Sequence, residues 1–155
     1  MNPNPEQREA FTVYGLGFHC ARAGDTLPQT TTEHLFKVTG GRCLIRLLYG
    51  EVTDTISATD PQIRITSTPT TGSAVALGAT VDTKDMAIGA FLLCENDTTA
   101  LVISTAGGII LAAGARKAVV PVGYIDLISA ASQTGSIQWD LYYVPLDAGA
   151  YIEAV

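Results

Sequence analysis

The stretch SIQWDLYY, residues 136–143, alternates between two kinds of side chain and decides the fold class. Its odd-numbered positions are large and apolar: Ile137, Trp139, Leu141 and Tyr143. Its even-numbered positions are Ser136, Gln138, Asp140 and Tyr142. Successive side chains of a β-strand point to opposite faces, so this period of two predicts a strand with one buried face. We expect Trp139 in the core, Tyr142 on the more exposed face, and an end to the strand at Pro145.

Short apolar runs of the same kind recur along the chain from residue 34, about ten residues apart. They are HLFKV (34–38), CLIRLLYGEVT (43–53), QIRIT (62–66), VALGATV (75–81), AFLLC (90–94), ALVIST (100–105), KAVVPV (117–122) and YIDLIS (124–129). Gly, Pro, Asn and Asp separate the runs, and amphipathic helical periodicity is nearly absent. About ten strands with such turns between them predict an all-β fold, an antiparallel β-sandwich or barrel.

Residues 34–53 carry the pattern of a β-hairpin. The runs HLFKV and CLIRLLYGEVT are joined by TGGR (39–42), a short loop with two glycines. Such a loop between two apolar runs predicts two adjacent antiparallel strands. A strict period of two then divides the second strand into two faces. One face is Leu44, Arg46 and Leu48, and the other is Cys43, Ile45, Leu47 and Tyr49.

Residues 1–33 differ in composition from the rest of the chain. We assign a β-sandwich domain to residues 34–155 and treat residues 1–33 as a separate N-terminal segment. Pro3 and Pro5 remove backbone donors and disfavour a helix. The segment FTVYGLGFHCA (11–21) is apolar and aromatic, and an extended polar connector is expected over residues 24–32. The apolar segment is either a first strand of the sandwich or an extended N-terminal arm that docks on a neighbour.

The composition describes a weakly charged, acidic protein. The 155 residues fit one domain, with 15% charged and 47% hydrophobic residues and a formal net charge of −6. Nucleic acids and anionic membrane surfaces both bind proteins through Lys and Arg, so neither is an expected partner. The N-terminal residues lack the basic and apolar regions of a secretory signal, and no apolar run is long enough to span a bilayer. We expect a protein that is made in the cytoplasm.

The potentially reactive residues form no known catalytic or metal-binding pattern. Cys20, Cys43 and Cys94 are odd in number and have no C-x-x-C spacing, which predicts free thiols. Cys43 and Cys94 each lie inside an apolar run, so we expect buried thiols that behave as small apolar side chains. Adding His19 and His34 produces none of the close ligand pairs typical of zinc sites. No nucleophile motif or phosphate-binding glycine loop is present. We expect no metal, no cofactor and no enzymatic activity.

Low charge and a mean hydropathy of +0.27 create a solubility problem for an isolated domain of this size. Unpaired strand edges add to the problem, because only three lysines are available to protect them. Both problems are reduced if identical copies or a larger scaffold cover much of the surface. We therefore expect a homo-oligomer that works as part of an assembly.

Two segments resemble small virion proteins of tailed bacteriophages. HLFKVTGGRCLIRLLYGEVT (34–53) is similar to their opening F-x-V-T-G-G … G-E-V-T segment. TGSIQWDLYYVPLDAGAYIEA (134–154) is similar to their closing segment, G-x-(I/V)-x-W-x-L-x-Y-x-P-L-(D/E)-x-G-A. The matched positions are Phe36, Gly40, Gly41, Gly50, Glu51, Trp139, Tyr143, Pro145, Leu146, Gly149 and Ala150. Proteins of this family are often head decoration (cement) proteins that bind an icosahedral shell as oligomers.

The resemblance implies a capsid decoration protein with a jelly-roll-like β-sandwich and an extended N-terminal arm. It would bind the major capsid protein at capsomer junctions, as a homo-oligomer that we expect to be a trimer, on the outer surface of the virion. Phe11, Tyr14 and Phe18 are the candidate contacts with the shell or with a neighbouring subunit. The alternative is a phage tail or adhesion module that binds host surface glycans through exposed aromatic side chains. A free-standing β-barrel that binds a small molecule is a third hypothesis.

Overall fold

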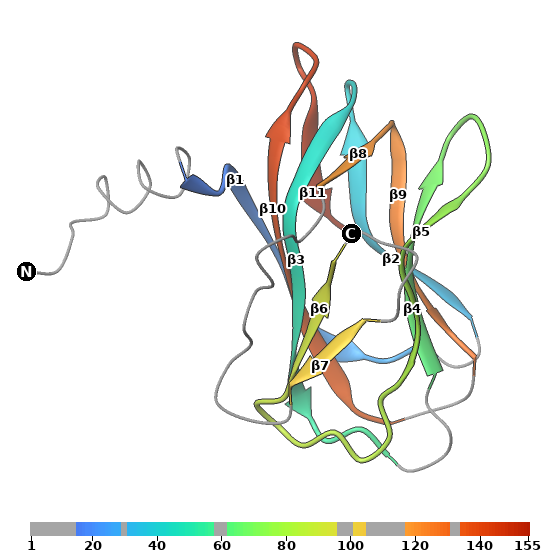
Figure 1. The fold of residues 1–155 in the computed structure, drawn as a ribbon. Helices are drawn as coiled ribbons and strands as arrows, with labels where there is room; N and C mark the ends of the chain where they lie inside the picture. The colour runs from blue at the N-terminus through green and yellow to red at the C-terminus, as the bar shows by residue number, and fades with distance from the viewer. Residues whose placement is uncertain (1–14, 29–30, 58–61, 96–100, 105–116, 131–133) are drawn as a thin grey trace, which may run out of the picture.

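The computed structural model describes residues 15–28, 31–57, 62–95, 101–104, 117–130 and 134–155, and its strands form two antiparallel sheets (Figure 1). Sheet A contains β1 (Phe18–Thr26), β3 (Cys43–Asp54), β6 (Phe91–Cys94), β7 (Val102–Ser104), β8 (Ala118–Val120) and β10 (Ser136–Pro145). Sheet B contains β2 (Thr32–Thr39), β4 (Gln62–Pro69), β5 (Val75–Asp82), β9 (Gly123–Ser129) and β11 (Tyr151–Ala154). The predicted all-β sandwich is confirmed.

Within sheet A the strands follow the order β1-β10-β3-β6-β7, and β8 pairs with β3 beside β6. Sheet B has the order β11-β2-β9-β4-β5. Among the strands that the structure describes, only β4–β5 and β6–β7 are neighbours both along the chain and within a sheet. Most connections therefore carry the chain from one sheet to the other, which ties the two layers together covalently at both ends.

The apolar faces of the two sheets form a single core that includes Trp139, which is fully buried. Ile137, Leu141 and Tyr143 are also buried, so the strand predicted from SIQWDLYY is confirmed, together with the core position of Trp139. Trp139 is paired with Gly50 on β3, and a Cβ atom on Gly50 would lie 2.9 Å from Cζ3 of the indole ring. The absence of a side chain at Gly50 leaves room for the ring.

The predicted hairpin over residues 34–53 is wrong, because its two strands lie in different sheets. β2 pairs with β11 and β9 in sheet B, whereas β3 pairs with β10, β6 and β8 in sheet A. Gly40 and Gly41 have φ angles of 77° and 155°, which are costly for other residues, and they turn the chain across the sandwich. Each strand has an apolar face, and the crossing lets the two faces pack against each other instead of lying side by side.

The predicted faces of the segment 43–49 are also wrong beyond Ile45. Tyr143 pairs with Ile45 and Tyr142 with Leu47, which leaves Arg46 without a partner on β10. The extra residue is a β-bulge, and it reverses the alternation of the strand. Leu48 is therefore fully buried, whereas Leu44 and Arg46 are only partly covered.

The sandwich begins before residue 34. Strand β1 pairs with β10 from Phe18 to Thr26, with an irregularity between Arg22 and Asp25. Residues 24–26, assigned to a polar connector, thus complete an edge strand of sheet A, and Thr32 already belongs to β2. Paired backbone groups fix these residues although their side chains are mostly exposed.

Candidate functional site

The structure describes one of the three predicted contact residues, Phe18. Phe11 and Tyr14 lie outside the described residues. Phe18 opens β1 opposite Tyr143, its ring centroid lies 5.9 Å from that of Tyr143, and about half of its surface is exposed. Phe18 is therefore an anchored aromatic side chain that still presents apolar surface at the edge of sheet A.

Phe18 pairs with Tyr143, two residues before the end of β10, so it lies near the end of the sandwich where three loops cross between the sheets (upper end in Figure 1). Residues 40–42 join β2 to β3, Pro121 and Val122 join β8 to β9, and residues 146–150 join β10 to β11. The β4–β5 loop reaches the same end, because the Thr70 amide donates a hydrogen bond to the Val122 carbonyl over 2.9 Å. We call this surface, made by residues 15–18, 40–42, 70–75, 118–122 and 146–151, the apolar end.

The apolar end carries most of the exposed large hydrophobic side chains of the described residues. It holds seven of the ten: Leu16, Phe18, Val75, Val119, Val122, Leu146 and Tyr151. A groove of about 280 Å³ opens at this end between β5 and β8, lined by Val75, Leu77, Val119 and Pro121 among others. Clustered apolar surface of this kind typically marks a contact with another molecule.

Two loops of the apolar end are fastened to each other by Arg42 and Asp147. The guanidinium of Arg42 donates from Nε to Oδ2 (2.9 Å) and from Nη2 to Oδ1 (2.8 Å) of Asp147, and the Arg42 amide also donates to Oδ2 (2.7 Å). These hydrogen bonds lower the pKa of the Asp147 carboxyl well below its ordinary value. The ion pair holds the β2–β3 and β10–β11 loops together at the surface.

Replacing Asp147 by asparagine is expected to lower the melting temperature slightly, by a few degrees or less, because the pair is exposed to solvent. A lowered pKa in the folded state stabilises the protein above the unfolded-state value of 3.8. This stabilisation is lost as the pH falls from that value towards the folded-state pKa, so the difference between wild type and variant should shrink below about pH 4. Thermal melts from pH 3 to 7 followed by circular dichroism measure it.

Asp85→Asn is the matched control for this prediction. Asp85 is exposed in a turn at φ 57°, a conformation that asparagine also tolerates, and none of the described residues pairs with it. This control should melt like the wild type at each pH. A difference between wild type and Asp147→Asn that stays constant down to pH 3 would contradict the assigned role of the carboxylate.

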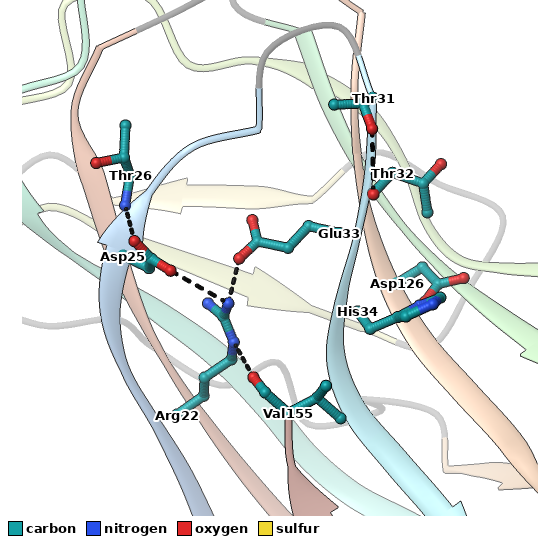
Figure 2. A network of polar contacts seen from close by, with 9 residues as sticks. All are labelled: Arg22, Asp25, Thr26, Thr31, Thr32, Glu33, His34, Asp126 and Val155. Carbon is teal, nitrogen blue, oxygen red and sulfur yellow. Dashed lines mark hydrogen bonds and ion pairs between the residues drawn. The ribbon is translucent and has the colours of Figure 1, made fainter.

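Arg22 closes one side of the sandwich, as Figure 2 shows. Its side chain comes from β1, forms a short ion pair with Glu33 of β2, and lies 3.6 Å from Asp25. Its Nε also donates to the Val155 carbonyl over 3.0 Å. Arg22 thus links an edge strand of sheet A to β2 of sheet B and to the residue that follows β11, and its 12% exposure shows that this contact is largely covered.

Each sheet carries one histidine–aspartate pair on its outer face. His19 Nε2 lies 2.6 Å from Asp140 Oδ1 in sheet A, and His34 Nδ1 lies 2.6 Å from Asp126 Oδ1 in sheet B (Figure 2 shows the latter). Both histidines are partly exposed, whereas both carboxylates are largely buried. A carboxylate held against one ring nitrogen fixes the orientation of the imidazole.

Both histidines also stack on a tyrosine of the neighbouring strand. The ring centroids are 4.6 Å apart for His19 and Tyr142, and 3.9 Å apart for His34 and Tyr124. Sequence reasoning missed both groups, although the Tyr and Asp of each lie two residues apart in a strand and so share a face. The partner histidine comes from another strand, and nothing in the sequence fixes which residue lies beside it.

The cysteines of the described residues are free thiols in covered positions. All three thiols are free, and burial raises the pKa of Cys20 and Cys43, which keeps them protonated at neutral pH. The prediction that Cys43 and Cys94 are buried is confirmed. Burial and the nearby Asp140 raise the pKa of Tyr49 to about 12. No group of three or more His, Cys, Asp or Glu side chains among the described residues is placed to hold a metal ion.

Comparison with known proteins found no relative of this chain. Scans against protein-family models, curated proteins and solved structures each found no match to this chain. Among the described residues, no helix is long and apolar enough to cross a membrane.

Proposed function

We propose that the protein is a structural protein of a phage virion, which decorates the capsid and stabilises it by binding the major capsid protein. The observation that carries this proposal is the clustering of exposed apolar side chains at the apolar end. Burying about 100 Å² of apolar surface contributes roughly 2.5 kcal/mol before ordering costs, so seven such side chains supply a useful contact. The resemblance of residues 34–53 and 134–154 to small phage virion proteins supports the same function.

The strand order supports a jelly-roll interpretation of the sandwich. Within the two sheets, the orders β1-β10-β3-β6 and β2-β9-β4-β5 resemble the two four-stranded sheets of a jelly roll, to which β7, β8 and β11 would be additions. This architecture recurs in capsid proteins and lectins. By itself it does not distinguish capsid decoration from the tail or adhesion alternative, since function depends on the surface and not on the fold.

In the proposed arrangement the sandwich stands on its apolar end at a junction between capsomers. A homo-oligomer, most simply a trimer, repeats the same contact around the local symmetry axis. The N-terminal segment, including Phe11 and Tyr14, extends the contact from the start of β1 onto the shell or a neighbour. The net charge of −6 is compatible with the outer capsid surface, away from packaged DNA.

Introducing charge at the apolar end is expected to remove the protein from the particle. In the double variant Val119→Asp/Leu146→Asp, docking would bury two carboxylates in an apolar contact, so retention on DNA-filled heads should fall by about tenfold or more. The measurement is cosedimentation of purified protein with heads of the phage that encodes it, after circular dichroism has shown that the variant is folded.

Ile88→Asp is the matched control, because Ile88 is the most exposed large hydrophobic residue among those described and lies in the β5–β6 loop, away from the apolar end. Its retention should equal that of the wild type. Equal retention of all three proteins would overturn the proposed docking surface. Immunogold labelling confined to tails would overturn the capsid location in favour of the adhesion alternative.

A further inference from the structure

We propose that the outer face of sheet B is a binding site for an acidic oligosaccharide, with the saccharide carboxylate held by Arg64 and a sugar ring lying against the exposed side of the Tyr124 ring, whose other side stacks on His34. This inference does not depend on the capsid role, because the face is distinct from the apolar end. It rests on a hollow, a cation without a carboxylate partner and a stacked aromatic pair, which lie on the same face of the sheet.

The hollow lies on the part of the outer face where β4 begins and β9 ends. It has a volume of about 230 Å³ and is lined by Gln62, Arg64, Thr80, Ile128 and Ala130. Three of the five side chains are polar, and they come from two strands, β4 and β5, while β9 and the residue that follows it supply the apolar floor. A concave site with an apolar floor and a few polar groups suits a small organic group better than a second protein.

Arg64 gives the hollow its preference for an anion. Its side chain is exposed, and no carboxylate of the described residues lies within ion-pair distance of it, although the protein carries a net charge of −6. A guanidinium binds a carboxylate through two parallel hydrogen bonds, which gives both charge and direction. An uncompensated arginine in a hollow is therefore suited to a carboxylate-bearing ligand.

The stacked pair lies next to the hollow on the same face. Asp126, which holds His34, is two residues from Ile128 on β9, and Tyr124 is two residues further. The rings of His34 and Tyr124 stack face to face, with centroids 3.9 Å apart and an angle of 15°, so each ring covers one face of the other and both remain partly exposed on the outside of the stack. Such amphipathic aromatic surfaces pack against the apolar faces of sugar rings while their polar atoms reach hydroxyl groups.

The distance between Arg64 and Tyr124 sets the length of the ligand. Arg64 is paired with Ile128 and Thr68 with Tyr124, so the arginine and the tyrosine are separated by four residues along the sheet. At about 3.3 Å per residue this is roughly 13 Å, more than one sugar ring. A monosaccharide or an inorganic anion would reach only one of the two subsites, whereas a disaccharide or longer chain reaches both.

The outer face of sheet A lacks this combination, although it carries the related pair His19 and Tyr142. Glu51 of β3 and Asp140 of β10 lie on the same face. The nearby Arg46 donates to the Gly15 carbonyl over 2.6 Å. Both sheets carry a carboxylate beside the aromatic pair, so the difference lies in the cation: Arg46 is bonded to a backbone carbonyl, whereas no described carboxylate pairs with Arg64. The described part of the chain therefore assigns the acidic ligand to sheet B.

The test is a glycan array in which each acidic oligosaccharide has a neutral counterpart of equal length, followed by calorimetric titration with the best binder. We expect uronate- or sialate-bearing chains to bind and their neutral counterparts not to bind. Arg64→Gln and Tyr124→Ala should each weaken the association constant by about tenfold or more, after circular dichroism has shown that both are folded. Lys84→Gln, which removes an exposed charge from the β5–β6 loop, should leave it unchanged.

Three outcomes overturn the inference. One is the absence of binding to any acidic oligosaccharide, and another is equal binding of acidic and neutral chains. The third is full competition by sulfate or by free glucuronate with no effect of Tyr124→Ala, which would reduce the site to a simple anion site at Arg64. Shell binding is unaffected in all three, so failure here is distinguishable from failure of the proposed capsid role.

Discussion

Replacing Trp139 by alanine is expected to lower the free energy of unfolding by about 3–5 kcal/mol. Trp139 is fully buried in the core formed by both sheets, and it pairs with Gly50, which cannot fill the space that the ring would leave. The loss combines the transfer free energy of the indole ring with a cavity that the rigid strands can only partly close. Since the chain has one tryptophan, urea denaturation should be followed by circular dichroism and not by fluorescence.

Ile88→Ala is the matched control for the tryptophan variant. Ile88 is 65% exposed, so its truncation should change the free energy of unfolding by less than about 0.5 kcal/mol. A Trp139→Ala variant as stable as this control would show that the two sheets do not pack over Trp139. The predicted loss is a large share of the stability of a typical domain, so the variant should also be present at reduced levels in cells.

Replacing Gly40 by alanine is expected to cost more than the same change at Gly89, although both glycines have nearly equal positive φ angles of 77° and 82°. At Gly89 a Cβ atom meets nothing within 4 Å, so only the backbone conformation is penalised, by about 1–2 kcal/mol. At Gly40 the new Cβ would lie 2.1 Å from the Gly149 carbonyl oxygen, closer than real contacts allow. Relieving this clash requires the β10–β11 loop to move, which should add about 1–3 kcal/mol.

The comparison of Gly40→Ala with Gly89→Ala tests one structural feature, the close approach of the β2–β3 and β10–β11 loops. Comparing the midpoints of urea denaturation for the two variants removes the common backbone penalty. Equal midpoints would mean that the two loops are not in contact at Gly40. Under the proposed function, Gly40→Ala should also weaken cosedimentation with heads, because both loops belong to the apolar end.

The two proposals use different surfaces and are compatible with each other. The apolar end terminates the sandwich, whereas Arg64 and Tyr124 lie on the outer face of sheet B. A subunit that stands on its apolar end would keep this face open to the surroundings. Variants at Val119 and Leu146 should therefore affect shell binding alone, and variants at Arg64 and Tyr124 should affect saccharide binding alone.

Predictions of individual strands succeeded where the pattern was local. The alternation in SIQWDLYY and the apolar runs between Gly, Pro, Asn and Asp predicted β10 and most of the other strands. The prediction failed at Arg46, where one bulged residue reversed the faces of β3. A bulge depends on the fit between two strands, and the sequence of one strand does not show it.

The candidate sites were less predictable than the strands. Phe18 was identified from its apolar, aromatic segment, but its neighbours at the apolar end come from loops distributed along the whole chain. His34, Asp126 and Tyr124 were missed because two strands separated by about ninety residues supply them. Chemistry-bearing residues become a site only when strand order brings them together.

The amino-acid sequence by itself determined the all-β class, the strand that buries Trp139 and the buried state of Cys43 and Cys94. These properties depend on alternation and on apolar runs within single strands, and both follow directly from the order of neighbouring residues. Only the tertiary structure decided that β2 and β3 lie in different sheets, that seven apolar side chains share one end, and that Arg64 lies on the same face of sheet B as the His34–Tyr124 stack. Those features depend on which strands pair and in what register, and that choice follows from the packing of the whole core and not from any local segment.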